Sequence, residues 1–315
     1  MGVGVFFVFF PKMKESLSVS QVVPWQRPQE KVREAETVPP SPIRILFGGD
    51  LMFDRHIRTA LRKQGNDFAL APLKETLAQA DLVVANLEGP ITDNASRSET
   101  SAVGARDNYY FTFDPAVAPL LKEFHIGAVN LGNNHISNFG QAGEQSTEKY
   151  LAAAGVKFFG APVSDDKRIL FQTIQGVKIA LVNYDQFIFK GKEKALADIR
   201  TAKEQAAVVI LYTHWGTEYV PATEPIKVLA HQFIEAGVDL IIGSHPHVVE
   251  ETEVYRGKTV YYSLGNMVFD QYFSEETKHG LLVRATLDPE TKQFSFEDIP
   301  IVLQSTGQTA LVSAH

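Results

Sequence analysis

Chemically active side chains occur in five short segments of this chain, each placed where an apolar run gives way to small and polar residues. The segments are FGGDLM (47–52), ANLEG (85–89), NLGNNH (130–135), YTHWG (212–216) and GSHPH (243–247). Their candidate functional residues are Asp50, Glu88, Asn134, His135, His214, His245 and His247. Imidazole nitrogens, carboxylates and amide oxygens bind divalent cations such as Mn, Zn and Fe, so this set indicates a metal-dependent site.

The His-Pro-His segment gives the sharpest of these signals. Residues i and i+2 of an extended chain point to the same side, so His245 and His247 are expected to face one cation. Glu88 adds to the case, because a carboxylate buried after an apolar run without a partner is costly. The structural alternatives are that Asp50 caps a helix and that His214 packs in an aromatic core.

Alternating strands and helices have to position these segments. Strands are predicted at 43–50, 82–89, 128–135, 177–185, 207–216 and 239–247. Helices are predicted through Leu61 and Leu77 and near 115–124, 140–154, 192–205 and 225–236. Two antiparallel hairpins follow, with turns at 256–258 and 288–290. Because ligands bind at the carboxyl ends of strands in open α/β sheets, the five polar segments are expected to meet there.

Composition restricts the class of protein. The chain has 315 residues, of which 44% are hydrophobic, enough for one large core or two modest ones. A net charge of -7 without a long basic stripe argues against nucleic-acid binding. The absence of cysteine excludes disulfides and thiolate zinc sites, which leaves His, Asp, Glu and Asn as metal ligands.

Residues 1–42 are predicted to lie outside the folded domain, which would span 43–303 and end in a tail at 304–315. The first ten residues, MGVGVFFVFF, are too few to cross a bilayer, which takes about 20 apolar residues. They also lack the basic start and cleavage site of a complete signal peptide. Two interpretations stay open: the remnant of a membrane anchor that begins upstream of Met1, or a loosely packed terminus. Residues 11 to about 42 are predicted to be a linker.

Six ordered motifs between about Ile43 and Asp270 resemble one known family. The motifs are GGDLM, NLEGPIT, NLGNNHISNFG, THWGTEY, GSHPHVVE and YYSLGNMVFD. They closely resemble bacterial capsule synthesis proteins of the poly-gamma-glutamate (CapA-like) family, which is related to calcineurin-like metallophosphoesterases. The resemblance implies an α/β fold, a four-layer α-β-β-α sandwich with mixed sheets. It also implies a role in poly-gamma-glutamate synthesis or export, in the cell envelope, with a cytoplasmic location as the alternative.

The resemblance implies roles for individual residues. Metal ligands are expected at Asp50, Glu88, Asn134, His214, His245 and His247. Asp50 and His247 would serve the first metal, and Glu88 would bridge it to a second, to which Asn134 would offer its amide oxygen with His214 and His245 beside it. His135 would act with Glu88 in catalysis, by donating a proton to the leaving group. Substrate contacts are expected at Arg55, Glu218 and Asn266, where Arg55 would supply positive charge for an acidic ligand.

Two departures from the phosphoesterase pattern leave the reaction open. That pattern has Asp-x-His in its first motif, whereas Met52 stands at the histidine position here, and Glu88 replaces the usual bridging Asp. His56, one helical turn later, is the candidate replacement ligand. The expected cofactor is therefore one or two divalent transition metal ions, with a metal-free site as the alternative.

Three functions are compatible with these residues. The first is a metal-dependent hydrolase or transferase acting on an anionic polymer or peptide. The second is a non-catalytic component that binds poly-gamma-glutamate beside membrane-bound capsule synthetase subunits. The third is a metal-free peptide epimerase in which His and Glu act as acid and base.

Overall fold

The computed structural model describes residues 1–13, 41–162 and 167–312. The chain divides into two units, Met1–Pro39 and Pro40–His315. In the first unit, residues 1–13 are exposed and form neither helix nor strand. Most of the predicted linker falls at 14–40, outside the described residues. Across the described ranges, no helix is both long enough and apolar enough to cross a bilayer.

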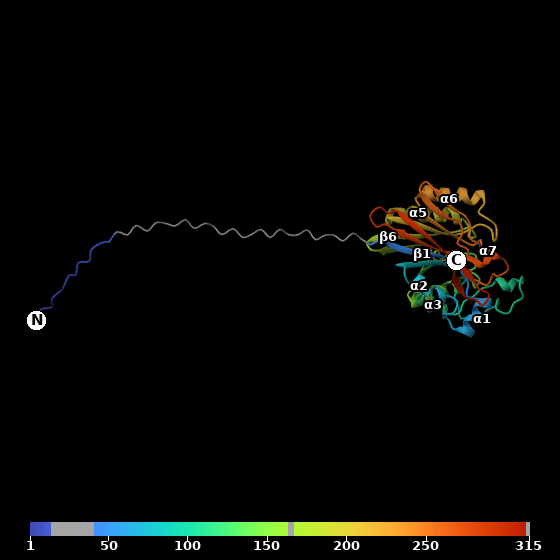
Figure 1. Ribbon diagram of the computed structural model, residues 1–315, viewed down its shortest axis with the longest axis horizontal. Coiled ribbons are helices and arrows are strands. Elements are labelled where there is room, and N and C mark those ends of the chain that lie inside the picture. Colours follow the sequence, from blue (N-terminus) through green and yellow to red (C-terminus); the bar gives the residue numbers. More distant parts are fainter. Residues whose placement is uncertain (14–40, 163–166, 313–315) are drawn as a thin grey trace. The chain divides into compact units, whose positions relative to one another are not determined.

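Two mixed sheets form the centre of the second unit (Figure 1). The first has the order β14-β13-β12-β1-β2-β3-β4, with β11 also paired to β1. Its strands are β1 (Ile43–Leu51), β2 (Leu82–Leu87), β3 (Ile126–Asn130), β4 (Lys157–Phe159), β11 (Asn266–Val268), β12 (His279–Leu287), β13 (Phe294–Leu303) and β14 (Thr309–Leu311). β1 to β4 run parallel, whereas β12, β13 and β14 join by antiparallel pairing.

The second sheet has the order β5-β6-β7-β8-β10-β9. Its strands are β5 (Ile169–Ile174), β6 (Val177–Asp185), β7 (Val208–His214), β8 (Leu240–Ser244), β9 (Thr252–Tyr255) and β10 (Lys258–Tyr261). The turn at Arg256 and Gly257 closes the β9–β10 hairpin, and both residues have the positive φ that a tight hairpin turn requires. Both predicted hairpins are present, since β12 and β13 also pair antiparallel.

Helices cover the outer face of each sheet (Figure 1). α5 (Gly191–Gln205) and α6 (Glu224–Ala236) pack on the second sheet. The first sheet carries α1 (Arg55–Gln64), η1 (Ala71–Leu73), α2 (Lys74–Leu77), α3 (Val117–Glu123) and α4 (Gly140–Ala154). Two short helices lie in loops, η2 (Arg106–Tyr109) and α7 (Glu275–Lys278). The layers therefore follow the predicted α-β-β-α order.

Strand periodicity explains why the layers stack. In β1, Ile45 and Phe47 belong to the core between the two sheets, while Leu46 belongs to the core beneath the helices. Side chains of a strand alternate between its two faces, and both faces are covered here, so residues 45–47 of β1 are apolar in succession. The hydroxyl of Tyr212 in β7 donates to the carbonyl oxygen of Gly48, which joins the sheets directly.

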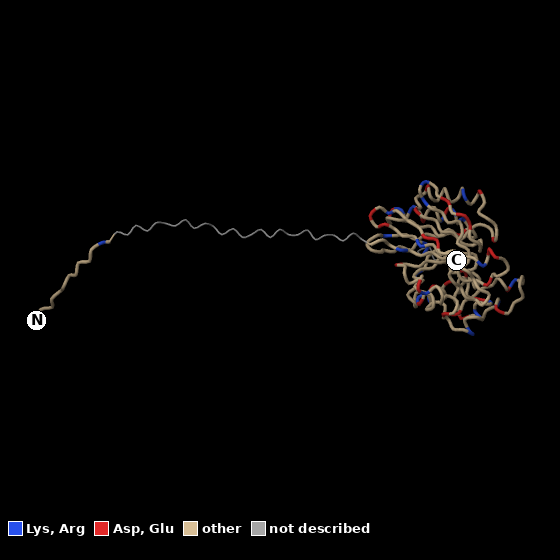
Figure 2. Tube along the Cα trace, viewed as in Figure 1, with Lys and Arg blue, Asp and Glu red and all other residues tan. Residues whose placement is uncertain are grey.

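Four strands were not predicted: the three-residue strands β4, β11 and β14, and the six-residue strand β5. β4 and β11 have three residues each, too few to show a period of two. β14, in the segment predicted as a tail, pairs with β13. The domain limits of 43–303 stay a prediction. Charged residues of both signs are interspersed over the folded unit (Figure 2).

Gly49 allows β1 to approach the segment before β11, and its replacement tests that contact. A Cβ on Gly49 would lie 1.9 Å from the carbonyl oxygen of Gly265, which accepts a hydrogen bond from the amide of Asp50. We expect Gly49→Ala to reduce the free energy of unfolding by about 2–4 kcal/mol in urea titrations, because the two backbones must separate. Gly257→Ala meets open space and strains only a left-handed backbone, so it should cost about 1 kcal/mol. Equal losses in the two variants would contradict this account.

Candidate metal centre

The predicted ligands meet where the parallel strands of both sheets end. Asp50 lies in β1 and pairs in register with Asn86 of β2, which pairs with Asn130 of β3. In the second sheet, His214 ends β7 beside Ser244, the last residue of β8. The register of the strands thus brings polar groups from distant segments into one cluster.

Two groups of ligand atoms share Glu88. Asp50, Glu88 and His247 each offer one atom within 4.8 Å of the others, and so do Glu88, His214 and His245. All five side chains are buried. A carboxylate common to two ligand groups is the arrangement that holds a pair of cations side by side.

Glu88 and His245 have unsatisfied ligand atoms. Both carboxylate oxygens of Glu88 and Nδ1 of His245 are buried without a hydrogen-bond partner among the described residues. Burial, together with the charge of Asp50, raises the pKa of Glu88 well above its ordinary value. Burial also lowers the pKa of His245 to about 4, so its imidazole is neutral. An unpaired buried polar group costs about 2–7 kcal/mol, and these donors fit a divalent cation that favours imidazole and carboxylate.

Asp50 is held as a carboxylate. Burial opposes its ionisation, but contacts with His247, His214 and Asn86 outweigh burial and lower its pKa to about 2. The Asn86 amide donates to Oδ1 at 2.8 Å, and the backbone amide of His245 donates to Oδ2 at 3.1 Å. The helix-cap alternative does not apply to Asp50, because Asp54 occupies the cap position of α1.

The His-Pro-His segment is not extended, which corrects the prediction that both rings face one cation. His245 and His247 have φ values of +99° and +59°, and their ring centroids lie 6.0 Å apart. Their ligand atoms belong to different groups of the cluster. Left-handed backbone at two non-glycine residues costs energy, and such strain is characteristic of functional sites.

Asn266 orients His247. The imidazole lies with Nδ1 3.0 Å from the side-chain oxygen of Asn266, while the amide nitrogen of Asn266 donates to the carbonyl oxygens of His247 and Thr277. An Nδ1–H that donates to Asn266 leaves Nε2 free, 3.7 Å from Glu88. Asn266 is fully buried, so it has a positioning role in place of the predicted substrate contact.

His214 and Asn134 face each other across the cluster. Nε2 of His214 lies 2.8 Å from Oδ1 of Asn134, and Nδ1 lies 3.0 Å from the hydroxyl of Ser244. Ser244 donates to the carbonyl oxygen of Thr213, so its oxygen is available to accept Nδ1–H. In that tautomer two lone-pair atoms, on His214 and Asn134, point at one position and suit a shared cation. The other tautomer donates Nε2–H to Asn134 instead.

His135 is half-buried, with its ring centroid 4.4 Å from that of Phe111. Its Nε2 lies 3.9 Å from Glu88, and burial lowers its pKa to about 4. Its Nδ1 lies 3.2 Å from Oδ1 of Asn138, which also accepts the backbone amide of Phe111 and is therefore an acceptor. The proton thus sits on Nδ1, and Nε2 faces the cluster without a proton.

His56 does not take the ligand position that Met52 leaves vacant in the first motif. Met52 is buried in the core beneath the helices. His56 is partly exposed, with Nε2 3.0 Å from the carbonyl oxygen of Ser305, and it belongs to neither ligand group. The first group therefore contains a single imidazole, that of His247.

A groove of about 280 Å³ adjoins the cluster and contains Arg55. The guanidinium of Arg55 pairs with Asp270 at 2.5 Å and lies over the rings of Phe111 and Phe269. The Phe269 ring in turn packs on His247, with centroids 4.8 Å apart. Arg55 is thus placed beside the cluster, but its charge is already matched by Asp270.

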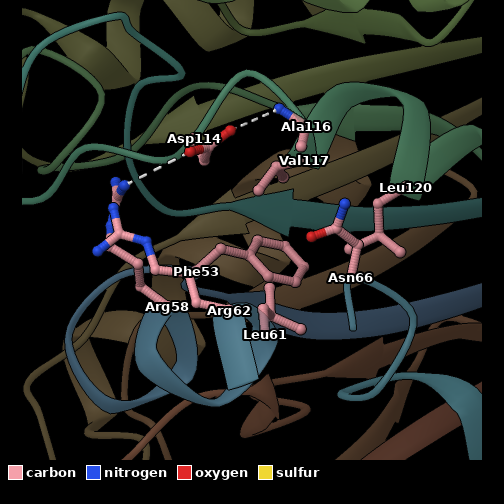
Figure 3. A pocket seen from close by; sticks show the side chains of 9 residues that line it. All are labelled: Phe53, Arg58, Leu61, Arg62, Asn66, Asp114, Ala116, Val117 and Leu120. Carbon is pink, nitrogen blue, oxygen red and sulfur yellow. Dashed lines mark hydrogen bonds and ion pairs between the residues drawn. The ribbon is translucent and has the colours of Figure 1, made fainter. Parts of the chain in front are cut away.

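Glu218 does not line this groove. The negative charge of Glu218 contributes to the raised pKa of Glu88. Glu218 therefore adds negative charge near the cluster, which would repel an anionic ligand. A second pocket, of about 250 Å³, lies between α1 and α3 and contains none of the predicted site residues (Figure 3).

A set of asparagines that the sequence analysis left out supports the cluster. Asn86 accepts hydrogen bonds from the amides of Asn130 and Asn133. Asn130 accepts one from Asn183 of β6, which links the two sheets. The side-chain oxygen of Asn133 accepts hydrogen bonds from the backbone amides of His135 and Ile136 and so stabilises the turn that follows β3. The sequence signal that could have identified them is an asparagine within an otherwise apolar strand, as in ANL (85–87), VNL (129–131) and VNY (182–184).

Comparisons with known proteins agree on one family. The family model described as bacterial capsule synthesis protein PGA_cap matches residues 44–271. The capsule biosynthesis protein CapA of Bacillus anthracis is 29% identical over 287 residues, covering 84% of this chain and 69% of that protein. The PGA biosynthesis protein CapA of Bacillus subtilis (strain 168) is 30% identical over 256 residues, covering 76% and 66%. The match thus spans about two thirds of each relative.

Two solved structures share the fold. A crystal structure described as a novel phosphatase from Mycoplasma pneumoniae has a TM-score of 0.51 at 18% identity and covers 83% of this chain and 94% of that one. A hypothetical protein from Thermus thermophilus has a TM-score of 0.51 at 16% identity, with 82% and 98% covered. The metallophosphoesterase-type sandwich predicted from the sequence is confirmed.

Glu88 is expected to destabilise the metal-free protein and to bind the cation when one is present. In protein treated with a chelator, Glu88→Gln should keep or raise the free energy of unfolding, by up to about 3 kcal/mol, because an amide is cheaper to bury than a carboxylate. Adding Mn²⁺ or Zn²⁺ should raise the melting temperature of the wild type and not that of the variant. Glu99→Gln, at a surface pair with Arg62, should change neither quantity. An equal metal-induced shift in both proteins would show that Glu88 is not a ligand.

Proposed function

Because the chain belongs to the bacterial capsule synthesis protein family PGA_cap, we propose that it acts in poly-gamma-glutamate synthesis or export as a metal-dependent hydrolase or transferase. The observation that carries the proposal is Glu88, which belongs to two ligand groups and whose two buried oxygens accept no hydrogen bond from the described residues. The names of the Bacillus relatives, capsule and PGA biosynthesis proteins, support the polymer as the substrate class.

The ligand set divides between the sheets. Asp50 and Glu88 come from the first sheet, whereas His214, His245 and His247 come from the second sheet and the loop that follows it. One or two cations bound here would act as Lewis acids, stabilising negative charge that develops on a phosphoryl or carbonyl oxygen. Asn134 and His135 are only partly buried, so substrate would approach from their side.

His135 is the proposed acid–base residue. Its Nε2 is unprotonated and faces the cluster, so it can take a proton from an attacking water or hydroxyl group. The protonated imidazole can then return that proton to the leaving group. Asn138 and the ring of Phe111 hold the imidazole in this orientation throughout.

The proposed setting is the cell envelope, beside membrane-bound capsule synthetase subunits. The support is the family membership and the names of the two relatives. The apolar residues 1–10 are compatible with a membrane-proximal position.

Metal analysis and turnover test the proposal together. Protein purified without chelators should hold at least one transition metal per chain, and His245→Ala should lose it. With Mn²⁺ added, the wild type should cleave bis(p-nitrophenyl) phosphate or shorten poly-gamma-glutamate. His135→Asn should reduce kcat by about 10²–10⁴-fold while keeping its metal.

Two outcomes would oppose the enzyme. Chelator-free protein without metal would remove the basis of the ligand assignment. Retention of poly-gamma-glutamate by metal-loaded wild type, with no cleavage of either substrate, would favour the non-catalytic assembly component instead.

A further inference from the structure

A loop beside the metal centre exposes two phenylalanines together. Residues 187–194, here called the Phe-Lys loop, connect the end of β6 to the first turn of α5. Phe189 is 81% exposed and Phe187 is 45% exposed. Single apolar side chains are common on protein surfaces, but neighbouring exposed aromatics mark a contact site.

Hydrogen bonds hold the start of this loop in place. The side chain of Gln186 accepts from the amide of Gly216 at 2.8 Å and donates to its carbonyl oxygen at 2.6 Å. The amide of Phe187 donates to Asp185 at 2.8 Å. At the far end, a Cβ on Gly191 would lie 2.2 Å from the carbonyl oxygen of Asp185, so the chain reverses tightly. The loop is therefore built to present Phe189 outward.

Three lysines accompany the phenylalanines. Lys190 precedes α5, and Lys192 and Lys194 lie in its first turn. Positive charge is unfavourable at this end of a helix, because the helix dipole is positive there. Within the described ranges none of the three forms an ion pair, and the ammonium of Lys190 lies 5.3 Å from the ring centroid of Phe189. Glu193 lies in the same turn and offsets one of these charges, and Lys194 lies close enough to Asp185 to act on its carboxyl group. Helix stability explains neither Lys190 nor Lys192, whose charges suit an external anionic partner.

We propose that the Phe-Lys loop docks the folded unit onto an anionic phospholipid surface. Phe189 would insert among the acyl chains while the lysines face headgroup phosphates, the combination by which peripheral proteins hold membranes. The chain as a whole carries a net charge of -7, so attraction to such a surface depends on this local positive charge. The inference stands independently of the proposed reaction.

Docking would set the metal centre close to the lipid. The ring of Phe187 lies 4.6 Å from that of His245 and 5.8 Å from that of His214. The same loop that reaches the membrane thus borders the ligand cluster, and a membrane-associated polymer chain would meet the cluster at the surface.

A single fluorescent label tests insertion. The chain has no cysteine, so Phe189→Cys can be labelled uniquely with an environment-sensitive nitrobenzoxadiazole dye. Val254→Cys, at a 68% exposed position in β9, is the matched control. With vesicles containing phosphatidylglycerol, we expect a blue shift at position 189 and none at 254. Binding through residues 1–10 alone would leave both labels in water, so an absent shift at 189, or equal shifts, would overturn the proposal.

A charge variant tests the lysines. On the labelled Phe189→Cys background, Lys192→Gln should weaken the lipid-dependent signal about fivefold, and Lys122→Gln on α3 should leave it unchanged. Vesicles of phosphatidylcholine alone should give a weaker response than those with phosphatidylglycerol. A blue shift induced by soluble poly-gamma-glutamate without vesicles would assign the loop to the polymer and overturn the lipid proposal. Metal content should be the same in all these variants, which separates this result from the fate of the proposed function.

Discussion

The need to satisfy polar groups buried between two apolar sheets governs this structure. Asp50, Asn86 and Asn130 lie side by side across three parallel strands, and the hydrogen bond from Asn183 to Asn130 extends the row into the second sheet. Each amide both donates and accepts, so the row uses nearly all of its hydrogen-bonding capacity. Glu88 is the exception, because no donor among the described residues reaches it. The cation of the proposed function would be the partner that completes the set.

Much of the fold followed from the sequence, because the central strands contain short runs of buried, largely β-branched residues, such as those of β7 and β8. The helix at 140–154 was placed at its observed bounds, since Gly155 ends it in a left-handed conformation. Three-residue strands such as β11 escaped prediction because their pairing depends on tertiary contacts. Asn266 is one example: the pairing of β11 with β1 places it beside Asp50, and this could not be derived from its spacing in the sequence.

The site was predicted better in membership than in geometry. Carboxyl-end segments of parallel strands must converge, which is why Glu88, His214 and His245 could be grouped without coordinates. The directions of the side chains could not, because they depend on backbone angles such as the positive φ of His245. The tautomer of His135 could not be derived either, since it depends on Asn138, whose side-chain oxygen is shown to be an acceptor by the amide of Phe111.

Because the ligands come from both sheets, a bound ion would affect how firmly the sheets are held together. Asp50 lies in β1 and Glu88 directly follows β2 of the first sheet, whereas His214 ends β7 and His245 and His247 follow β8 of the second, in a chain that has no cysteine. A bound ion would therefore cross-link the layers at one edge of the sandwich, much as a disulfide joins distant parts of an exported protein. The stability of the packing between the two sheets would then depend on the metal concentration. Loss of the ion would destabilise the fold as well as the site.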